Sequence, residues 1–171
     1  MKIKLIKQTP FGAVGIVWSA TRDCPKIARV ILSKPDLPDE AQLSANYPGL
    51  TAGSCAEIAE VASKIRAILE REVVEIPIDT IDLNDCPPFQ QYALRAIRKI
   101  PRGKVSTYQL IALKLDKPGA ARAVGNAMAN NPFPIIIPCH RAIRTDGTLG
   151  GYQGGITMKR RLLEIEGADI H

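Results

Sequence analysis

The feature that most constrains the fold is an apolar run between prolines that ends in three reactive side chains. Residues 131–141 read Asn-Pro-Phe-Pro-Ile-Ile-Ile-Pro-Cys-His-Arg. A run of β-branched residues of this length, bounded by prolines, predicts a short buried strand. Cys139 would then lie at the end of a buried strand, followed directly by an imidazole and a guanidinium. A buried cysteine is usually an inert apolar residue, and its thiol becomes a nucleophile only when a base or a cation lowers its pKa. The run alone therefore leaves packing and chemistry both open.

The positive charge of the chain is confined to its second half. The 171 residues carry a net charge of +6, but residues 1–88 hold 10 Lys and Arg against 12 Asp and Glu, whereas residues 89–171 hold 13 against 5. A basic surplus restricted to one half is typical of a module that binds a polyanion. It favours nucleic acid over a surface that is merely basic.

Composition excludes several other classes. No apolar run approaches the length of a membrane span, and residues 1–7 alternate charged and apolar side chains, unlike a signal peptide. We expect a cytoplasmic protein, nuclear if the cell is eukaryotic, with no membrane partner. The four cysteines form no CxxC pair and there are only two histidines, so no metal site is expected. Cys24, Cys55 and Cys86 are interpreted as packing residues.

The first half predicts a structural α+β domain over residues 1–80. Strand-like runs cover Lys2–Lys7, Ala13–Ala20 and Lys26–Leu32, with turn residues between them. Residues 35–53 read as a long surface loop. The capping-box pattern of residues 54–57 then predicts a helix over residues 54–72 whose apolar stripe packs on the sheet.

The second half, residues 87–171, predicts a helix-turn-helix. A first helix begins at Pro88 and stops at residues 101–103. A second capping box, residues 106–109, opens a helix that residues 116–119 break, and a further helix runs over residues 120–129. Asp146-Gly147 is a hairpin signal that would form a short wing. Four glycines surround Tyr152, and a final helix covers residues 157–166.

The helix over residues 120–129 has an unusual composition for a reader of base edges. It offers only Arg122 and Asn126 as long polar side chains and is otherwise built of small residues. Small residues allow a backbone to approach a surface closely, which favours a fit into the minor groove with one inserted cation. The alternative is a tightly packed internal helix.

The Pro138–Arg141 segment, preceded by Asn131-Pro132 and followed by Gly150-Gly151-Tyr152, resembles the active-site signature of the O6-alkylguanine-DNA alkyltransferases. The resemblance covers about residues 87–166, and the first half matches only in general layout. It implies an α+β fold in which a ribonuclease-H-like three-stranded sheet with a helix precedes a C-terminal winged helix-turn-helix domain that carries the active site.

The resemblance also implies the reaction. The alkyl group on O6 of guanine in duplex DNA would pass irreversibly to Cys139, once per molecule and without a cofactor. His140 would act as base through a water and Glu166 would orient it. Asn131 would bridge the active-site turn to the helix-turn-helix and bear on the thiol, and Tyr108 would donate a proton to the guanine. The spent thioether form is expected to be less stable, because an alkyl group is added to a close-packed site.

Base flipping and minor-groove binding follow from the same resemblance. Arg122 would fill the gap left by the extruded base. The remaining DNA-contact residues expected are Ala121, Asn126 and Thr107. The substrate pocket expected comprises Met128, Leu149, Gly150, Gly151, Tyr152, Gln153 and Gly154. Gln153 stands where several relatives have a smaller residue, so the tolerated alkyl size is left open, as is repair of O4-methylthymine.

Two other functions compete with alkyl transfer. One is a helix-turn-helix regulator or damage-sensing protein that binds DNA without transfer chemistry. The other is a cysteine hydrolase that uses Cys139 and His140, although such enzymes separate nucleophile and base in sequence and need an oxyanion hole. Arg141 is interpreted as a structural ion-pair partner in each case, and no obligate protein partner is expected.

Overall fold

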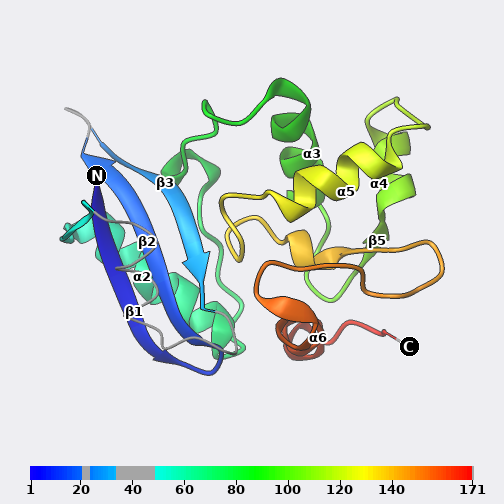
Figure 1. Ribbon diagram of the computed structural model, residues 1–171. Helices are drawn as coiled ribbons and strands as arrows, with labels where there is room; N and C mark the ends of the chain where they lie inside the picture. The colour runs from blue at the N-terminus through cyan, green and yellow to red at the C-terminus, as the bar shows by residue number, and fades with distance from the viewer. Residues whose placement is uncertain (21–23, 34–48, 171) are drawn as a thin grey trace. The chain divides into compact units, whose positions relative to one another are not determined.

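A computed structural model describes residues 1–20, 24–33 and 49–170, and the chain divides into two compact units, Met1–Leu83 and Asn84–His171 (Figure 1). The N-terminal unit pairs a sheet with one long helix, whereas the C-terminal unit is mainly helical, so the predicted α+β class is confirmed. Within the described ranges, no helix combines the length and the apolar composition needed to cross a bilayer.

The N-terminal sheet has the strand order β3-β2-β1-β4. β1 (Lys2–Thr9), β2 (Gly12–Ala20) and β3 (Pro25–Leu32) form the predicted antiparallel meander. β2 is an interior strand of this sheet, and its residues 13–18 are all buried. α2 (Ala56–Leu69) lies along one face of the sheet in Figure 1.

Two predictions in this unit are wrong in detail. Residues 35–53 are not a loop throughout, because β4 (Thr51–Ala52) pairs in parallel with the start of β1; residues 35–48 lie outside the described residues. A two-residue strand has no periodicity from which to predict it. The capping box at residues 54–57 does not form either, because Cys55 is the N-cap of α2 and makes no side-chain cap bond.

The cysteines outside the proposed site differ in exposure. Cys86 is 5% exposed and packs in the core as predicted. Cys24 is exposed and Cys55 is half-buried, so the packing interpretation is wrong for Cys24.

The C-terminal unit is built from four α-helices: α3 (Pro88–Arg98), α4 (Tyr108–Lys114), α5 (Ala121–Ala129) and α6 (Gly155–Glu166). Pro88 occupies the first turn of α3, where its missing N–H costs no hydrogen bond. α4 and α5 form the predicted helix-turn-helix. The N-cap of α4 is Thr107 rather than Ser106, and its hydroxyl accepts a 3.1 Å hydrogen bond from the backbone N–H of Leu110.

The predicted hairpin turn at Asp146-Gly147 forms, but the wing that it makes is short, because Arg144 and Thr148 are the pair that joins its two arms. β6 (Ala142–Ile143) pairs in parallel with β5 (Ser106–Thr107), and Asp146-Gly147 forms a turn closed by the bond from the N–H of Arg144 to the carbonyl of Thr148. No strand follows this turn in residues 149–170. The β5–β6 pairing fixes the segment after Cys139 to the start of α4, which begins at Tyr108.

Candidate active site

Cys139 is carried by a sharp turn and not by the predicted strand. The strand prediction for residues 135–137 is wrong: Ile135 has a φ of +73°, and the backbone N–H of Ile137 bonds to the carbonyl of Phe133 at 2.8 Å. Three prolines in this segment remove the N–H donors that a ladder needs. Pro138 has φ −78° and ψ 61°, and the N–H of Cys139 bonds to the carbonyl of Ile137 at 2.7 Å. This inverse γ-turn places Cys139 at the start of the short helix η2 (Cys139–Arg141).

Asn131 holds this turn closed from the inside. Its side chain is fully buried; Oδ1 accepts a hydrogen bond from the N–H of Phe133 at 2.9 Å and Nδ2 donates to the carbonyl of Ile137 at 3.1 Å. The two bonds satisfy backbone groups at both ends of a segment that forms no sheet. The same side chain also hydrogen-bonds Cys139, which lowers the pKa of the thiol.

The sulfur of Cys139 lies in an environment that opposes its ionisation. Cys139 is 3% exposed, and its burial raises the pKa of the thiol to about 11, although the Asn131 side chain and the charge of Lys159 act in the opposite direction. Cys139 is therefore a neutral thiol in the free protein at pH 7. Any reaction through this sulfur needs a proton acceptor that acts when the substrate is present.

His140 and Glu166 form a buried pair at the centre of the unit. Nε2 of His140 lies 2.9 Å from Oε1 of Glu166, and the two side chains are 2% and 3% exposed. Arg141 completes the cluster, because its Nε donates to Oε2 of Glu166 at 2.9 Å and a terminal nitrogen donates to Oε1 at 2.8 Å. Arg141 also bonds to the carbonyl of Ile100 at 2.6 Å, so it is held as an ion-pair partner inside the fold.

This cluster fixes the protonation states of its members. Burial alone would raise the pKa of Glu166, but the hydrogen bonds and charges of His140 and Arg141 outweigh it and lower the pKa to about 2. Burial lowers the pKa of His140 despite the opposing effect of Glu166. The ring is then neutral, with its proton on Nε2 facing the carboxylate. Nδ1 is left as an acceptor, and it is buried with no partner among the described residues.

Tyr108 lies at the first position of α4, against the loop predicted to form the pocket. Burial, followed by the charge of Cys139, raises the pKa of Tyr108, so the phenol keeps its proton. Gly150 has a φ of +69°, and a Cβ atom there would lie 2.9 Å from the hydroxyl oxygen of Tyr108. Glycine is therefore needed at this position both for the backbone conformation and for the close approach.

Lys159, on the inner face of α6, was not among the predicted site residues. Its side chain is fully buried, and Nζ donates to the carbonyl of Ala142 at 2.6 Å and to that of Leu149. Nζ also lies 6.0 Å from the centre of the Tyr108 ring. Burial lowers the pKa of Lys159 to about 8 while the charge of Cys139 acts against this, so the site holds a cation at pH 7.

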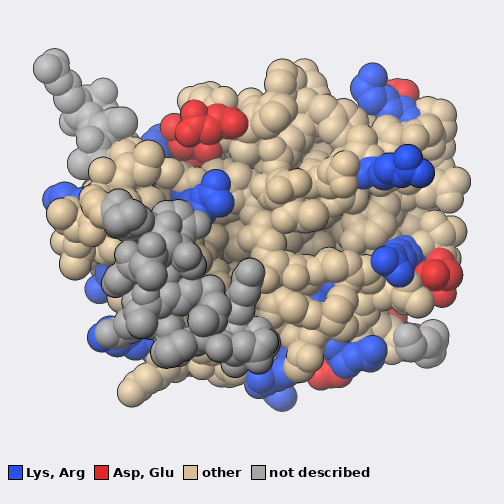
Figure 2. Space-filling model, viewed as in Figure 1, with Lys and Arg blue, Asp and Glu red and all other residues tan. Residues whose placement is uncertain are grey.

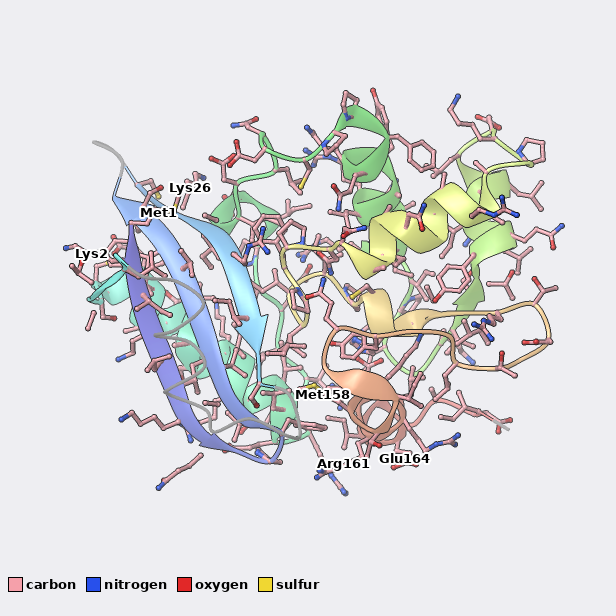
Figure 3. All side chains as sticks on the ribbon, viewed as in Figure 1. Met1, Lys2, Lys26, Met158, Arg161 and Glu164 are labelled. Atoms are coloured by element: carbon pink, nitrogen blue, oxygen red, sulfur yellow. The ribbon has the colours of Figure 1, made fainter. Side chains whose placement is uncertain are left out.

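The sequence contained a signal for Lys159. Leu162 and Leu163 are buried three and four residues later, on the same helical face, and a lysine on an apolar face is unusual. The opposite face of α6 carries ordinary exposed charges, as Arg161 and Glu164 show in Figure 3.

The predicted pocket residues differ in burial and in what they contact. Met128 is 5% exposed in the last turn of α5, and Leu149 packs in a cluster with Ile143 and Leu163. The Tyr152 ring meets that of His140 edge-on with centres 6.3 Å apart, and its hydroxyl is buried with no partner among the described residues. Gln153 points to the end of α5, where it donates two hydrogen bonds. Gly154 is the buried N-cap of α6.

A pocket of about 410 Å³ that opens to solvent lies against this loop. Its lining includes the predicted Leu149, Gly150 and Gly151, together with two arginines that were not predicted, Arg144 and Arg160. The charge of Arg144 also lowers the pKa values of Tyr108 and Lys159, which places it within electrostatic range of the site.

The outer face of α5 combines small residues with two longer polar side chains. Val124, Ala127 and Met128 face inward, whereas Arg122, Ala123 and Asn126 are exposed. A Cβ atom on Gly125 would meet nothing within 4 Å. The small residues on this face therefore do not serve internal helix packing. On the face drawn in Figure 2, the C-terminal unit carries its Lys and Arg side chains around the margin of a broad uncharged surface.

The other two predicted DNA-contact residues lie at helix starts. Ala121 is the first residue of α5 and is half-buried, and Thr107 uses its hydroxyl to cap α4. Within the described part of the chain, no group of three or more His, Cys, Asp or Glu side chains is arranged to hold a metal ion.

Comparison with known proteins gives the same family from sequence and from structure. Residues 88–168 match the family model of the 6-O-methylguanine DNA methyltransferase DNA-binding domain. The methylated-DNA–protein-cysteine methyltransferase of Methanothermobacter thermautotrophicus is 40% identical over 113 residues, which cover 66% of this chain and 63% of that protein. The Salmonella typhimurium protein of the same name is 48% identical over 91 residues, 53% of each chain. The matched segments thus span little more than half the length of these curated relatives.

A solved structure matches over nearly the full length. The protein in the crystal structure of Mycobacterium tuberculosis OGT in complex with DNA is 31% identical in sequence, and the two structures superpose with a TM-score of 0.79. The match covers 98% of this chain and 93% of that protein. The resemblance inferred from the residues around Cys139 is therefore confirmed. The chain belongs to the O6-methylguanine-DNA methyltransferase family, the methylated-DNA–protein-cysteine methyltransferases.

Proposed function

We propose that this protein repairs alkylated duplex DNA by moving the alkyl group from O6 of guanine to the sulfur of Cys139. The observation that carries the proposal is the buried Cys139–His140–Glu166 arrangement, in which a thiol adjoins a neutral imidazole whose Nδ1 is an available acceptor. Each molecule acts once, because the product is a thioether that the site has no means of cleaving.

Activation of the thiol begins with proton transfer toward His140. The side chains of consecutive residues point in different directions, so the proton passes from Cys139 to Nδ1 through a bridging water. Glu166 stabilises the imidazolium that forms, because its carboxylate is ionised and lies 2.9 Å from Nε2. Asn131 and the cation of Lys159 favour the thiolate, since both lower the pKa of Cys139.

Bond changes at the alkyl carbon follow directly. A bond forms from the Cys139 sulfur to the carbon, the bond from that carbon to O6 breaks, and its electron pair leaves with the guanine. The leaving base is stabilised by a hydrogen bond from Tyr108, whose raised pKa keeps the phenol protonated. The proton lost by the thiol reaches the departing guanine through solvent, so guanine leaves as a neutral molecule.

DNA reaches this site through the exposed face of α5. Arg122 stands in the first turn, and the bare surface over Ala123 and Gly125 allows the helix to enter a narrow groove closely. Because the target atom is stacked inside a duplex, the guanine must flip out, with Arg122 in its place. Ala121, Asn126 and Thr107 complete the contact surface. The protein works where DNA is kept, in the cytoplasm or in a nucleus.

The test is the intact mass of the protein after incubation with duplex DNA that contains O6-methylguanine. We expect the mass to rise by one methyl group, and we expect no rise with unmodified duplex. Cys139→Ala should lose the increment. Cys86→Ala is the matched control, because Cys86 is a second buried thiol, 5% exposed, that lies outside the cluster and should leave transfer intact.

Three other outcomes would contradict the proposal. Tight binding of the lesion with no mass change would indicate a damage sensor. Release of a modified base or nucleotide with unchanged protein mass would indicate a hydrolase. A methyl increment that survives in Cys139→Ala would assign the chemistry to another residue.

A further inference from the structure

Gln153 joins the loop of the proposed pocket to the end of the helix that faces DNA. Its Nε2 donates to the carbonyl of Ala129 at 3.0 Å and to the carbonyl of Asn131 at 2.7 Å. Both N–H groups of the amide are used. The carbonyls at the end of a helix have no partner inside the helix, so a side chain that supplies two donors fixes this end firmly.

A second glutamine makes the same kind of contact from a different element. Nε2 of Gln90, on α3, donates to the carbonyl of Asn130 at 2.9 Å and to that of Ala127 at 3.4 Å. The two glutamines thus serve four of the five carbonyls from Ala127 to Asn131. Only Gln153 comes from the pocket loop, whereas Gln90 ties α5 to the helical framework.

The position of Gln153 links two walls of the proposed pocket. Met128 precedes Ala129 in the last turn of α5, and Tyr152 precedes Gln153 in the loop. The two hydrogen bonds therefore set the separation between the wall that carries Met128 and the wall that carries Tyr152. They also hold the backbone of Asn131, whose side chain bears on the Cys139 sulfur.

We propose that Gln153 is a positioning residue that locks the pocket loop to the C-terminal end of α5 and thereby restricts the alkyl groups that the site accepts. This inference rests on the proposed alkyl transfer. With the lock closed, the loop and α5 cannot separate, so a methyl group fits and a bulky group must first break two hydrogen bonds. Without the lock, the loop moves outward and the penalty on bulky groups falls.

The test compares methyl and benzyl transfer from O6 of guanine in the same duplex. Gln153→Glu keeps the size of the side chain but replaces the donor with an oxygen that repels both carbonyls. Gln90→Glu is the matched control, since it removes the equivalent bonds and adds the same charge on the other side of the helix end. We expect the ratio of benzyl to methyl rate constants to rise about thirtyfold in Gln153→Glu, roughly the combined effect of the two hydrogen bonds. The ratio should stay unchanged in Gln90→Glu.

Hydrogen exchange of the backbone amides supplies a second measurement that needs no chemistry. Residues 149–154 should exchange faster in Gln153→Glu than in the parent protein or in Gln90→Glu. If either glutamate variant does not fold, the neutral pair Gln153→Met and Gln90→Met replaces it in both measurements, because methionine has a similar length and no donor.

The outcomes separate the two proposals. Equal rate ratios in the parent and in Gln153→Glu overturn the lock, and so does an equal rise in both variants, which would reflect a general loosening of the helix end. Unchanged exchange of residues 149–154 also overturns it. Absence of methyl transfer by the parent protein would instead refute the proposed function. In that case, faster exchange of residues 149–154 confined to the Gln153 variant would still support the role of Gln153 in holding the loop to α5.

Discussion

Replacing Glu166 with glutamine tests the buried charge cluster of the site. The carboxylate of Glu166 is 3% exposed and accepts hydrogen bonds from Arg141 and His140. These bonds exist in the folded protein and not in the unfolded chain, so they stabilise the ionised carboxylate only in the folded state. The lowering of its pKa from 4.5 to about 2 corresponds to a stabilisation of about 3 kcal/mol at neutral pH. Glutamine keeps the shape of the side chain and removes the charge. We expect Glu166→Gln to unfold with a free energy about 3 kcal/mol lower than the parent at pH 7.

The size of this difference should depend on pH in a defined direction. Because the pKa of Glu166 is lower in the folded than in the unfolded protein, its contribution is complete above about pH 4.5 and is lost as the pH falls through about 2. The gap between parent and variant should shrink to about half near pH 3 and close near pH 2.

Urea unfolding followed by far-ultraviolet circular dichroism at several pH values measures this gap. Glu164→Gln is the matched control, because Glu164 is exposed on the same helix and its replacement should leave the parent's curve unchanged. A gap between parent and Glu166→Gln that stays constant from pH 7 to pH 3 would refute the assignment of the stabilisation to ionised Glu166.

Three further predictions concern the reaction itself. Lys159→Met should move the pH at which methyl transfer becomes fast to a higher value, because the lysine cation lowers the pKa of the thiol; a transfer rate with the same pH profile as the parent would contradict this role. Gly150→Ala should slow transfer and cost about 1–2 kcal/mol in unfolding free energy, since alanine would adopt a φ of +69° and press on the Tyr108 hydroxyl. Gly151→Ala, where a Cβ atom meets nothing within 4 Å, should match the parent in unfolding free energy. Arg122→Ala should slow transfer from duplex DNA about a hundredfold but leave the reaction with free O6-benzylguanine unchanged. Equal losses with both substrates would show that Arg122 acts at the pocket and not in base flipping.

The sequence predicted the helices and the meander because these elements have strong periodic signals. Pro88 marked the start of α3, and the final helix predicted over residues 157–166 falls within α6. The helix starts were less accurate, since the N-caps are Cys55 and Thr107 where the capping-box pattern predicted the serine just before each. A one-residue shift is expected when neighbouring Ser, Thr and Cys can each begin a helix.

The active-site segment shows why backbone shape was harder to predict than location. The isoleucines before Cys139 are buried as expected, but burial alone does not distinguish a strand from a packed turn. The decisive features are the left-handed Ile135 and the two bonds of the Asn131 side chain, and neither follows from a local pattern. Lys159 was missed because a lysine is assumed to be solvated, although its neighbours one turn later are apolar.

The burial of Cys139 sets the energetic problem that the rest of the site must solve. With a pKa of about 11, only roughly one sulfur in ten thousand is ionised at pH 7, and forming the thiolate costs about 5 kcal/mol. A nucleophile kept in this state reacts slowly with small electrophiles, which lowers wasteful alkylation of a protein that can act only once. In the proposed reaction the proton therefore leaves the sulfur only once the flipped guanine is in place, where His140 accepts it through a water before the bond to the alkyl carbon forms. Asn131 and Lys159 act in the opposite direction to burial, and burial has the larger effect on the pKa of the thiol.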